Sequence, residues 1–215
     1  MSGMSAAKDL VVLVADKDAE FAVKGLLSRQ KSLRIRPLQT DVFVHPGRDS
    51  GCFNDSVSFL RGHCGSYSHA LVFLDRDGSG QEALDREAIE ARLESGLTTS
   101  GWEDRAAAIV LSPELEIWVW SDSPEVDVAL GWTGRTPSLR EWLRIEGHLP
   151  DPDAAQGVNS VKPADPKAAF LGALRASRTP RSASLFEKLA QTVGLDRCSD
   201  PAFLKLKATL RRWFT

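Results

Sequence analysis

Three short, continuous runs of apolar residues constrain the fold of this chain more than any other feature of its sequence. They read LVVLVA at 10–15, ALVFL at 70–74 and AAAIVL at 106–111. Runs of this length are typical of strands that are covered on both faces of a sheet. Segments with helix-like spacing or composition follow the first two runs, namely KDAEFAVKGLLSRQ and QEALDREAIEARLES. Strands that alternate with helices predict βαβ units and a mainly parallel sheet.

The segments around these runs complete the predicted organisation. Residues 33–47 are expected to form one or two strands interrupted at Pro37, and 52–64 a short helix. Ser112 and Pro113 are expected to open a further helix as N-cap and first helical residue. After a loop over 148–166, helices are predicted at 165–177, 182–195 and 199–214. We therefore expect an α/β domain over 8–122 and a helical C-terminal subdomain over 123–215.

Bulk composition narrows the class of protein. The chain has 215 residues, 42% of them hydrophobic and 26% charged, as in an ordinary globular protein. No apolar run approaches the length of a membrane span, and the N-terminus lacks the pattern of a secretory signal. Three cysteines suit a reducing compartment. We therefore expect a cytoplasmic protein with no membrane contact.

Charge is unevenly distributed along the chain. The net charge is only −2, but residues 160–215 hold 11 Lys/Arg against 4 Asp/Glu, and the rest of the chain is correspondingly acidic. An acidic front and a basic tail fit metal and phosphate chemistry beside a nucleic-acid contact surface. The simpler interpretation is a helical tail with solvated basic faces.

Each of the three predicted buried strands ends in polar residues. Asp16 follows the first, Asp75 and Asp77 the second, and Ser112 with Glu114 the third. In parallel α/β sheets the functional crevice lies beyond the carboxyl ends of the strands, so these side chains are expected to converge. Carboxylate oxygens are the ligands that hard divalent cations prefer, often together with substrate phosphates.

The stretch LVFLDRDG (71–78) closely resembles the first motif of haloacid-dehalogenase-type phosphatases. That resemblance implies Asp75 as nucleophile, the second aspartate as general acid and Ser112 as a phosphate contact. However, the family places this motif on its first core strand, whereas a βα unit precedes it here. It also needs an apolar strand ending in two acids after residue 120, and the sequence offers none. We keep this function as an alternative.

A second resemblance covers more of the chain, about residues 9–212. VVLVADKDAEFAVKGLL resembles the opening of a Toprim domain, and LVFLDRDG its D-x-D strand. IVLSPELEIWVWSD is similar to the P-E-x-E-x-W segment of Toprim-like proteins of bacterial anti-phage defence loci, the OLD-nuclease-like group. KPADPKAAF and DPAFLKLKATL match the helical tail of that group. The resemblance implies a Toprim-like Rossmannoid sheet flanked by helices, followed by an α-helical C-terminal subdomain.

The Toprim resemblance also implies a site and a cofactor. Asp16, Asp75 and Asp77 would hold one or two Mg²⁺ or Mn²⁺ ions, with Glu114 as general base or further ligand. Glu116 would lie beside the same centre, and Glu114 is preferred because it is nearer the strand end. The family's first-motif glutamate is missing at the expected strand end; Asp16 is our choice for it, and Glu20, one helical turn later, is the substitute.

The implied function is a divalent-metal-dependent phosphoryl-transfer enzyme, a nuclease or nuclease-like component of bacterial defence. Lys162 and Lys167 flank the KPADPK turn and are candidate phosphate contacts. The implied partners are DNA or RNA and other subunits of a defence system. A further alternative is an adaptor that keeps the fold but has lost its metal site. The sequence leaves open the substrate, the partners and the oligomeric state.

Overall fold

The computed structural model describes residues 7–150, 162–196 and 198–215. Within them the strands form a four-stranded, fully parallel sheet in the order β2-β1-β3-β4. The strands are β1 (Lys8–Val14), β2 (Thr40–Val44), β3 (Tyr67–Asp75) and β4 (Ala106–Leu111). The α/β class and the parallel sheet predicted from the apolar runs are confirmed.

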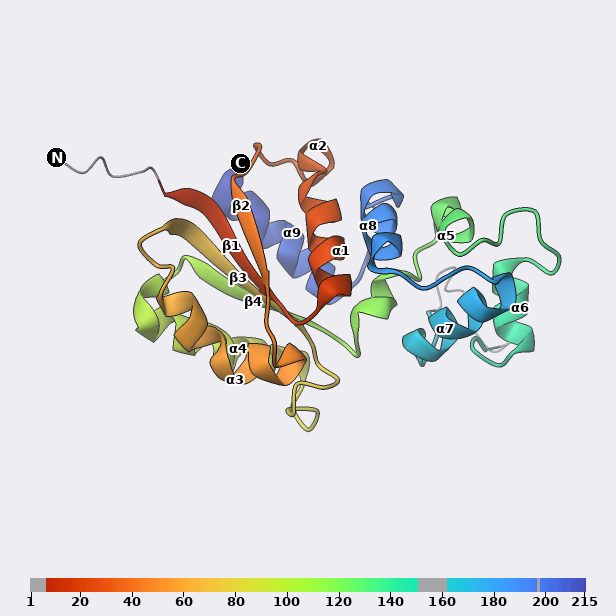
Figure 1. Cartoon of the computed structure of the whole chain (residues 1–215), viewed down its shortest axis with the longest axis horizontal. Coiled ribbons are helices and arrows are strands. Elements are labelled where there is room, and N and C mark those ends of the chain that lie inside the picture. The colour runs from red at the N-terminus through yellow and green to blue at the C-terminus, as the bar shows by residue number, and fades with distance from the viewer. Residues whose placement is uncertain (1–6, 151–161, 197) are drawn as a thin grey trace.

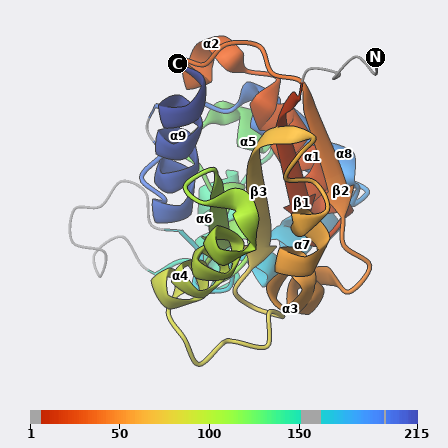
Figure 2. The ribbon, with the colours of Figure 1, turned by 90° about the vertical axis from the view of Figure 1, so that its left-hand side faces the viewer.

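Helices cover both faces of the sheet, as Figures 1 and 2 show. On one face lie α1 (Lys17–Leu27) and α9 (Pro201–Phe214), with α8 (Ala183–Thr192) packed beside α1. On the other face lie α3 (Arg48–Arg61) and α4 (Arg86–Leu97). The central strands are therefore buried on both sides, which explains why they are apolar without alternation.

Successive residues of a strand point to opposite faces of the sheet, so the strands contribute side chains to two apolar cores. Val12 and Phe73 contribute to the core that includes α1, α8 and α9, and both are at most 1% exposed. Val11 and Val72 contribute to the core under α3 and α4 and are fully buried.

The remaining helical elements are short, except α7 (Pro166–Ser177). The short ones are α2 (Gln30–Leu33), the π-helical turn η1 (Thr98–Trp102), the 3₁₀ turn η2 (Leu115–Trp118), α5 (Pro124–Ala129) and α6 (Leu139–Ile145). The first apolar core runs on without a break across the predicted boundary between residues 122 and 123. Buried Leu130, Phe170 and Phe186 belong to the same cluster as Val12.

Several local predictions agree with the structure. Asp165 caps α7 by accepting a hydrogen bond from the Ala168 amide at 2.8 Å, and Pro166 occupies the first turn. Pro37 does separate two elements, but they are α2 and β2 rather than two strands. The predicted 148–166 loop falls largely on residues 151–161, which lie outside the described residues.

Two predicted helix starts are wrong. The expected helix at Ser112 and Pro113 is instead an extended segment that leads into η2. The Asp77 amide donates to the Pro113 carbonyl at 3.1 Å, and this bond holds the segment beside the continuation of β3. Helix α3 begins at Arg48, earlier than expected, so that Asp49 lies in its first turn.

Candidate functional site

The ends of β3 and β4 run side by side, and the pairing continues past the sheet. Asp75, the last residue of β3, is in register with Leu111, the last residue of β4. The Arg76 amide then donates to the Leu111 carbonyl at 2.8 Å, before the bond from Asp77 to Pro113. This ladder carries the chain after β4 back across the carboxyl edge of the sheet, so residues 114–116 come close to Asp75.

Three carboxylates meet at this edge. Oxygen atoms of Asp75, Glu114 and Glu116 all lie within 4.8 Å of one another. We refer to these three side chains as the carboxylate cluster. Glu114 is 7% and Glu116 3% exposed, although both are charged residue types that are rarely buried without a partner.

Burial shifts the protonation of the cluster. Desolvation, helped by the nearby carboxylates of Asp49 and Glu116, holds the pKa of Asp75 well above its ordinary value, although the Leu115 amide donates to the Asp75 carboxylate. Burial likewise raises the pKa of Glu116. Both shifts mean that negative charge is disfavoured at this site when nothing compensates it.

Two cations from the C-terminal part of the chain reach the cluster. Lys167 Nζ in α7 lies 2.5 Å from Glu114 Oε2, and a guanidinium nitrogen of Arg181 lies 3.9 Å from Glu116 Oε1. Burial opposes the charged form of Lys167, but Glu114 and Glu116 outweigh it and raise the Lys167 pKa. Arg181 also donates to the carboxylate of Asp18 in the first turn of α1.

The structure brings together only some of the residues predicted for the site. Asp75 and Glu114 lie in the cluster, and Lys167 contacts it directly. Asp77 is exposed. Lys162 lies 3.8 Å from Asp200, at the N-cap of α9.

The two acids expected to complete the site are held by local structure. Asp16 caps α1 by accepting from the Ala19 amide at 2.9 Å, and Arg48 lies 3.5 Å from its other oxygen. Glu20 lies between Lys17 and Lys24, each at 2.6 Å from one of its carboxylate oxygens. Asp16 still faces the carboxylates of Asp75 and Asp49 closely enough to influence their pKa values. Glu20 is buried and its charge is neutralised by the two lysines of α1.

Sequence reasoning missed one acid beside the cluster. Asp49 lies in a turn-like stretch, HPGRDSG, that carries no strand-end signal. In the structure its carboxylate accepts from the Asp75 amide at 2.8 Å, and burial raises the pKa of Asp49. Only the placement of α3 beneath the end of β3 brings this residue to the site.

The donor set fits a hard divalent cation. Three carboxylates from two adjacent chain segments offer only oxygen ligands, and Mg²⁺ and Mn²⁺ are bound by such groups. A cation would also offset the buried negative charge that raises the pKa values of Asp75 and Glu116.

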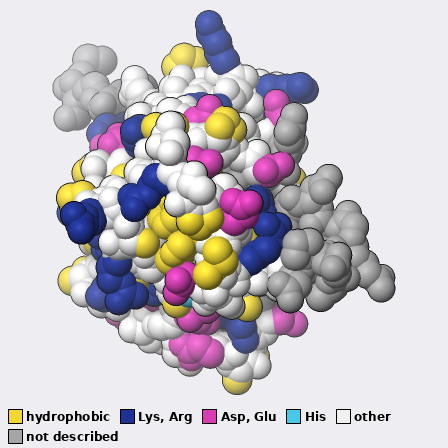
Figure 3. All heavy atoms as spheres, turned by 90° about the vertical axis from the view of Figure 1, so that its right-hand side faces the viewer, with side chains coloured by type: hydrophobic (Ala, Val, Ile, Leu, Met, Phe, Trp, Pro, Cys, Tyr) yellow, Lys and Arg dark blue, Asp and Glu magenta, His cyan; other side chains and the backbone are white. Residues whose placement is uncertain are grey.

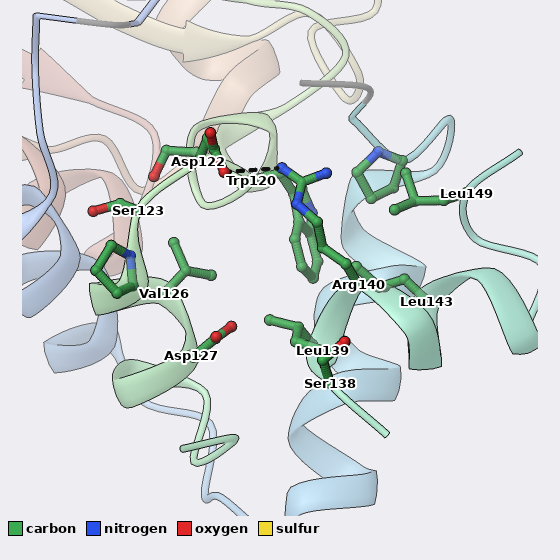
Figure 4. Close-up of a pocket in the computed structure, with 13 residues that line it drawn as sticks. Trp120, Asp122, Ser123, Val126, Asp127, Ser138, Leu139, Arg140, Leu143 and Leu149 are labelled. Atoms are coloured by element: carbon green, nitrogen blue, oxygen red, sulfur yellow. Dashed lines mark ion pairs between the residues drawn. The ribbon is translucent and has the colours of Figure 1, made fainter. Parts of the chain in front are cut away.

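A separate cavity of about 300 Å³ lies between α5 and α6 and shares no lining residue with the carboxylate cluster (Figure 4). Val126 and Leu139 contribute to its apolar wall. Asp122 and Arg140 lie 3.8 Å apart at its edge, and Ser121 has a buried hydroxyl with no hydrogen-bond partner among the described residues. Its polar groups carry both signs of charge and so indicate no single ligand class.

Comparison of the chain with protein families, curated proteins and solved structures finds no match. The fold and the site define the class as an α/β protein with a Rossmann-like parallel sheet and a cluster of three carboxylates, two of them buried, at its carboxyl edge. Among the described helices, none has the length and apolar character needed to cross a membrane.

Proposed function

We propose that this protein is a divalent-metal-dependent phosphoryl-transfer enzyme of the nuclease type, and that it acts in bacterial anti-phage defence in the cytoplasm. The observation that supports the metal-dependent chemistry is the meeting of Asp75, Glu114 and Glu116 within 4.8 Å at the carboxyl edge of a parallel sheet. The defence role rests on the sequence resemblance alone.

In this proposal the cluster holds Mg²⁺ or Mn²⁺, which when bound polarises a phosphodiester and lowers the pKa of a coordinated water. Half-buried Asp75 and buried Glu116 supply ligand oxygens. Glu114, whose carboxylate contacts Lys167 Nζ at 2.5 Å, has a second role open to it as a general base. Lys167 itself is half-exposed and can turn to a substrate phosphate.

The phosphatase alternative is less well supported by the geometry. A nucleophilic aspartate must be ionised, but burial raises the pKa of Asp75. The second aspartate of that motif, Asp77, is exposed, whereas Asp75 faces Glu114 and Glu116.

A metal-free adaptor is favoured by one observation. The first strand contributes no free ligand beside Asp75, because the Asp16 carboxylate caps α1 and Glu20 is paired with two lysines. In that case the acidic edge would bind a basic partner and cleave nothing.

Calorimetric titration of Mn²⁺ into the full chain tests the proposal, with cleavage of labelled DNA and RNA measured alongside. We expect binding by the wild type, loss of binding in Asp75→Asn and Glu116→Gln, and cleavage that requires the metal. Asp77→Asn is the matched control, because it removes an exposed acid two residues from Asp75 and should keep metal binding. Absence of Mn²⁺ binding by the wild type would overturn the metal-dependent function and favour the metal-free adaptor. Binding of Mn²⁺ without cleavage of DNA or RNA would overturn the nuclease assignment.

A further inference from the structure

A basic depression lies where α7 ends and the chain passes to α8. Its volume is about 420 Å³, within the range of small-ligand pockets. We call it the arginine pocket, and it is lined by Leu171, Leu174, Arg175, Arg178, Thr179, Pro180 and Arg181. Figure 3 faces the end of the molecule that carries α5, α6 and α7, and shows Lys and Arg side chains on both sides of an apolar patch.

The arginines of this pocket have donors to spare. Arg175 and Arg178 are exposed, and in the described part of the chain neither forms an ion pair. Arg175 uses only its Nε, which donates to the Leu171 carbonyl at 3.3 Å. A guanidinium offers five N–H donors in a planar fork that matches phosphate oxygens, so these side chains are available to an anion.

Arg178 has a backbone conformation that side chains rarely adopt. Arg178 ends α7 in the left-handed conformation, with φ of 61°. Glycine is the residue that helices favour at this position, since a side chain there costs free energy. Arg178 lines the pocket in this conformation, which Arg34 at the end of α2 also adopts.

Arg181 connects the arginine pocket to the carboxylate cluster. It lines the pocket, and its guanidinium also contacts Asp18 and lies 3.9 Å from Glu116. Lys167, on the same helix as Arg175, reaches Glu114. A chain of phosphates that passes over Arg175 and Arg178 would therefore arrive beside the three carboxylates.

We propose that the arginine pocket binds the phosphodiester backbone of a single-stranded nucleic acid and leads it to the carboxylate cluster. Leu171, Leu174 and Pro180 provide an apolar floor for an unpaired base or sugar, which a duplex would keep stacked inside. This inference rests on the proposed function, because it assigns a substrate-binding role next to that centre.

Fluorescence anisotropy of a labelled single-stranded oligonucleotide tests the inference, measured with the full chain in EDTA over a range of salt concentrations. The variant Arg175→Ala/Arg178→Ala is expected to bind about 10-fold or more weakly. The slope of log affinity against log salt should fall by about 1.4, because two single-strand phosphate contacts are lost. The matched control is Lys31→Ala/Arg61→Ala, which removes two exposed cations from α2 and α3 and should bind like the wild type.

A second variant separates binding from folding. Arg178→Gly relieves the positive φ and should unfold at the same temperature as the wild type or higher, yet bind the oligonucleotide more weakly. Equal binding by the arginine variants and the lysine–arginine control would overturn the inference. So would displacement of the oligonucleotide by poly-glutamate at the same charge concentration, since the pocket would then suit an acidic protein.

The outcome is distinguishable from that of the proposed function. If the chain binds the oligonucleotide through these arginines but does not bind Mn²⁺, the nucleic-acid site is supported and the metal-dependent function is overturned. If Mn²⁺-dependent cleavage is unchanged in Arg175→Ala/Arg178→Ala, the metal-dependent function is supported and the nucleic-acid site at the arginine pocket is overturned.

Discussion

At the scale of single residues, the carboxylate cluster is short of positive charge. Carboxylate oxygens of Asp75, Glu114 and Glu116 lie within 4.8 Å of one another. Among the residues that the structure describes, only two cations face these three acids, Lys167 at 2.5 Å from Glu114 and Arg181 at 3.9 Å from Glu116. Buried charges of one sign are costly unless they are paired, protonated or bound to a metal. The folded chain therefore carries a local cost that a divalent cation would relieve, and substitutions of single residues can measure it.

The Lys167–Glu114 pair gives the first prediction. Lys167→Gln leaves a buried carboxylate beside two others, so the metal-free protein should lose about 1–2 kcal/mol of unfolding free energy, since Lys167 is half-exposed. Urea unfolding in EDTA measures this loss, and saturating Mn²⁺ should reverse most of it.

Lys24→Gln is the matched control for Lys167→Gln. It removes an exposed lysine from Glu20, which keeps Lys17 as a partner, and should change stability by less than about 0.5 kcal/mol. Equal losses of unfolding free energy in the two variants would show that the Lys167–Glu114 pair stabilises the fold no more than an exposed ion pair does.

The members of the site differ in how far the sequence could predict them. Asp75 and Glu114 follow from apolar runs that stop at a polar residue, which marks the carboxyl edge of the sheet. The prediction that Asp77 joins Asp75 in the site requires the chain to turn both side chains toward the crevice. In the structure the pairing of Asp77 with Pro113 continues the strand path, and Asp77 is exposed. Asp49 depends on where α3 packs, which no local pattern encodes.

At the scale of elements, strands were predicted more accurately than helix ends. β1, β3 and β4 have unbroken apolar runs because both faces are covered. Helix ends depend instead on single caps and on tertiary hydrogen bonds. The predicted start at Asp165 is confirmed because the cap itself is in the sequence, whereas Ser112 resembles a cap but lies in a segment held extended by Asp77.

The contact between α1 and α8 depends on a glycine. A Cβ built on Gly25 would lie 2.7 Å from the Glu187 carbonyl oxygen and 2.8 Å from the Ala190 Cβ, too close for either atom to accommodate. Gly25→Ala should therefore lower the unfolding free energy by about 1–3 kcal/mol, even though alanine is the better helix former. Denaturant unfolding checks this. Gly65→Ala, where no atom lies within 4 Å, is the control and should be near neutral.

The packing of β3 against α9 should depend on pH through His69. Its ring stacks on Trp213 with centroids 4.5 Å apart, and burial, with the charge of Arg105, lowers the pKa of His69 below its usual 6.5. The unfolded chain then binds a proton more readily than the folded one. The contribution of neutral His69 to the unfolding free energy is complete above pH 6.5 and is lost as the pH falls toward the lowered pKa of His69.

The variant His69→Phe tests this pH dependence, because it keeps an aromatic ring against Trp213 but has no titrating group. The unfolding free energy of the wild type should decrease relative to His69→Phe by up to about 1.4 kcal/mol per pH unit below 6.5. Chemical unfolding at a series of pH values measures the difference. Parallel curves for the two proteins would mean that His69 does not titrate in this range.

At the scale of the whole molecule, the C-terminal helices complete the α/β layer structure. α9 lies on the same face of the sheet as α1, and α8 packs on α1 (Figure 1). Trp118, on the segment after β4, contacts both Phe73 of β3 and Phe203 of α9, with ring centroids 5.4 and 5.7 Å apart. The division into 8–122 and 123–215 was predicted from the change from alternating elements to helices alone. A change in the type of predicted elements does not show where the C-terminal helices pack.

The shared core predicts how fragments of the chain will behave. A fragment that ends at residue 122 keeps α1 but lacks α8 and α9, and so exposes the part of the apolar sheet face that α9 covers, together with the side of α1 that packs on α8. We expect it to aggregate or to unfold without a cooperative transition, because it cannot bury that face. The full chain should unfold in a single transition, with the same midpoint by circular dichroism and by tryptophan fluorescence. Cooperative unfolding of the fragment at the midpoint of the full chain would instead establish residues 8–122 as an independent domain. The C-terminal helices would then be an appendage that supplies Lys167 and Arg181 to the site without stabilising the sheet.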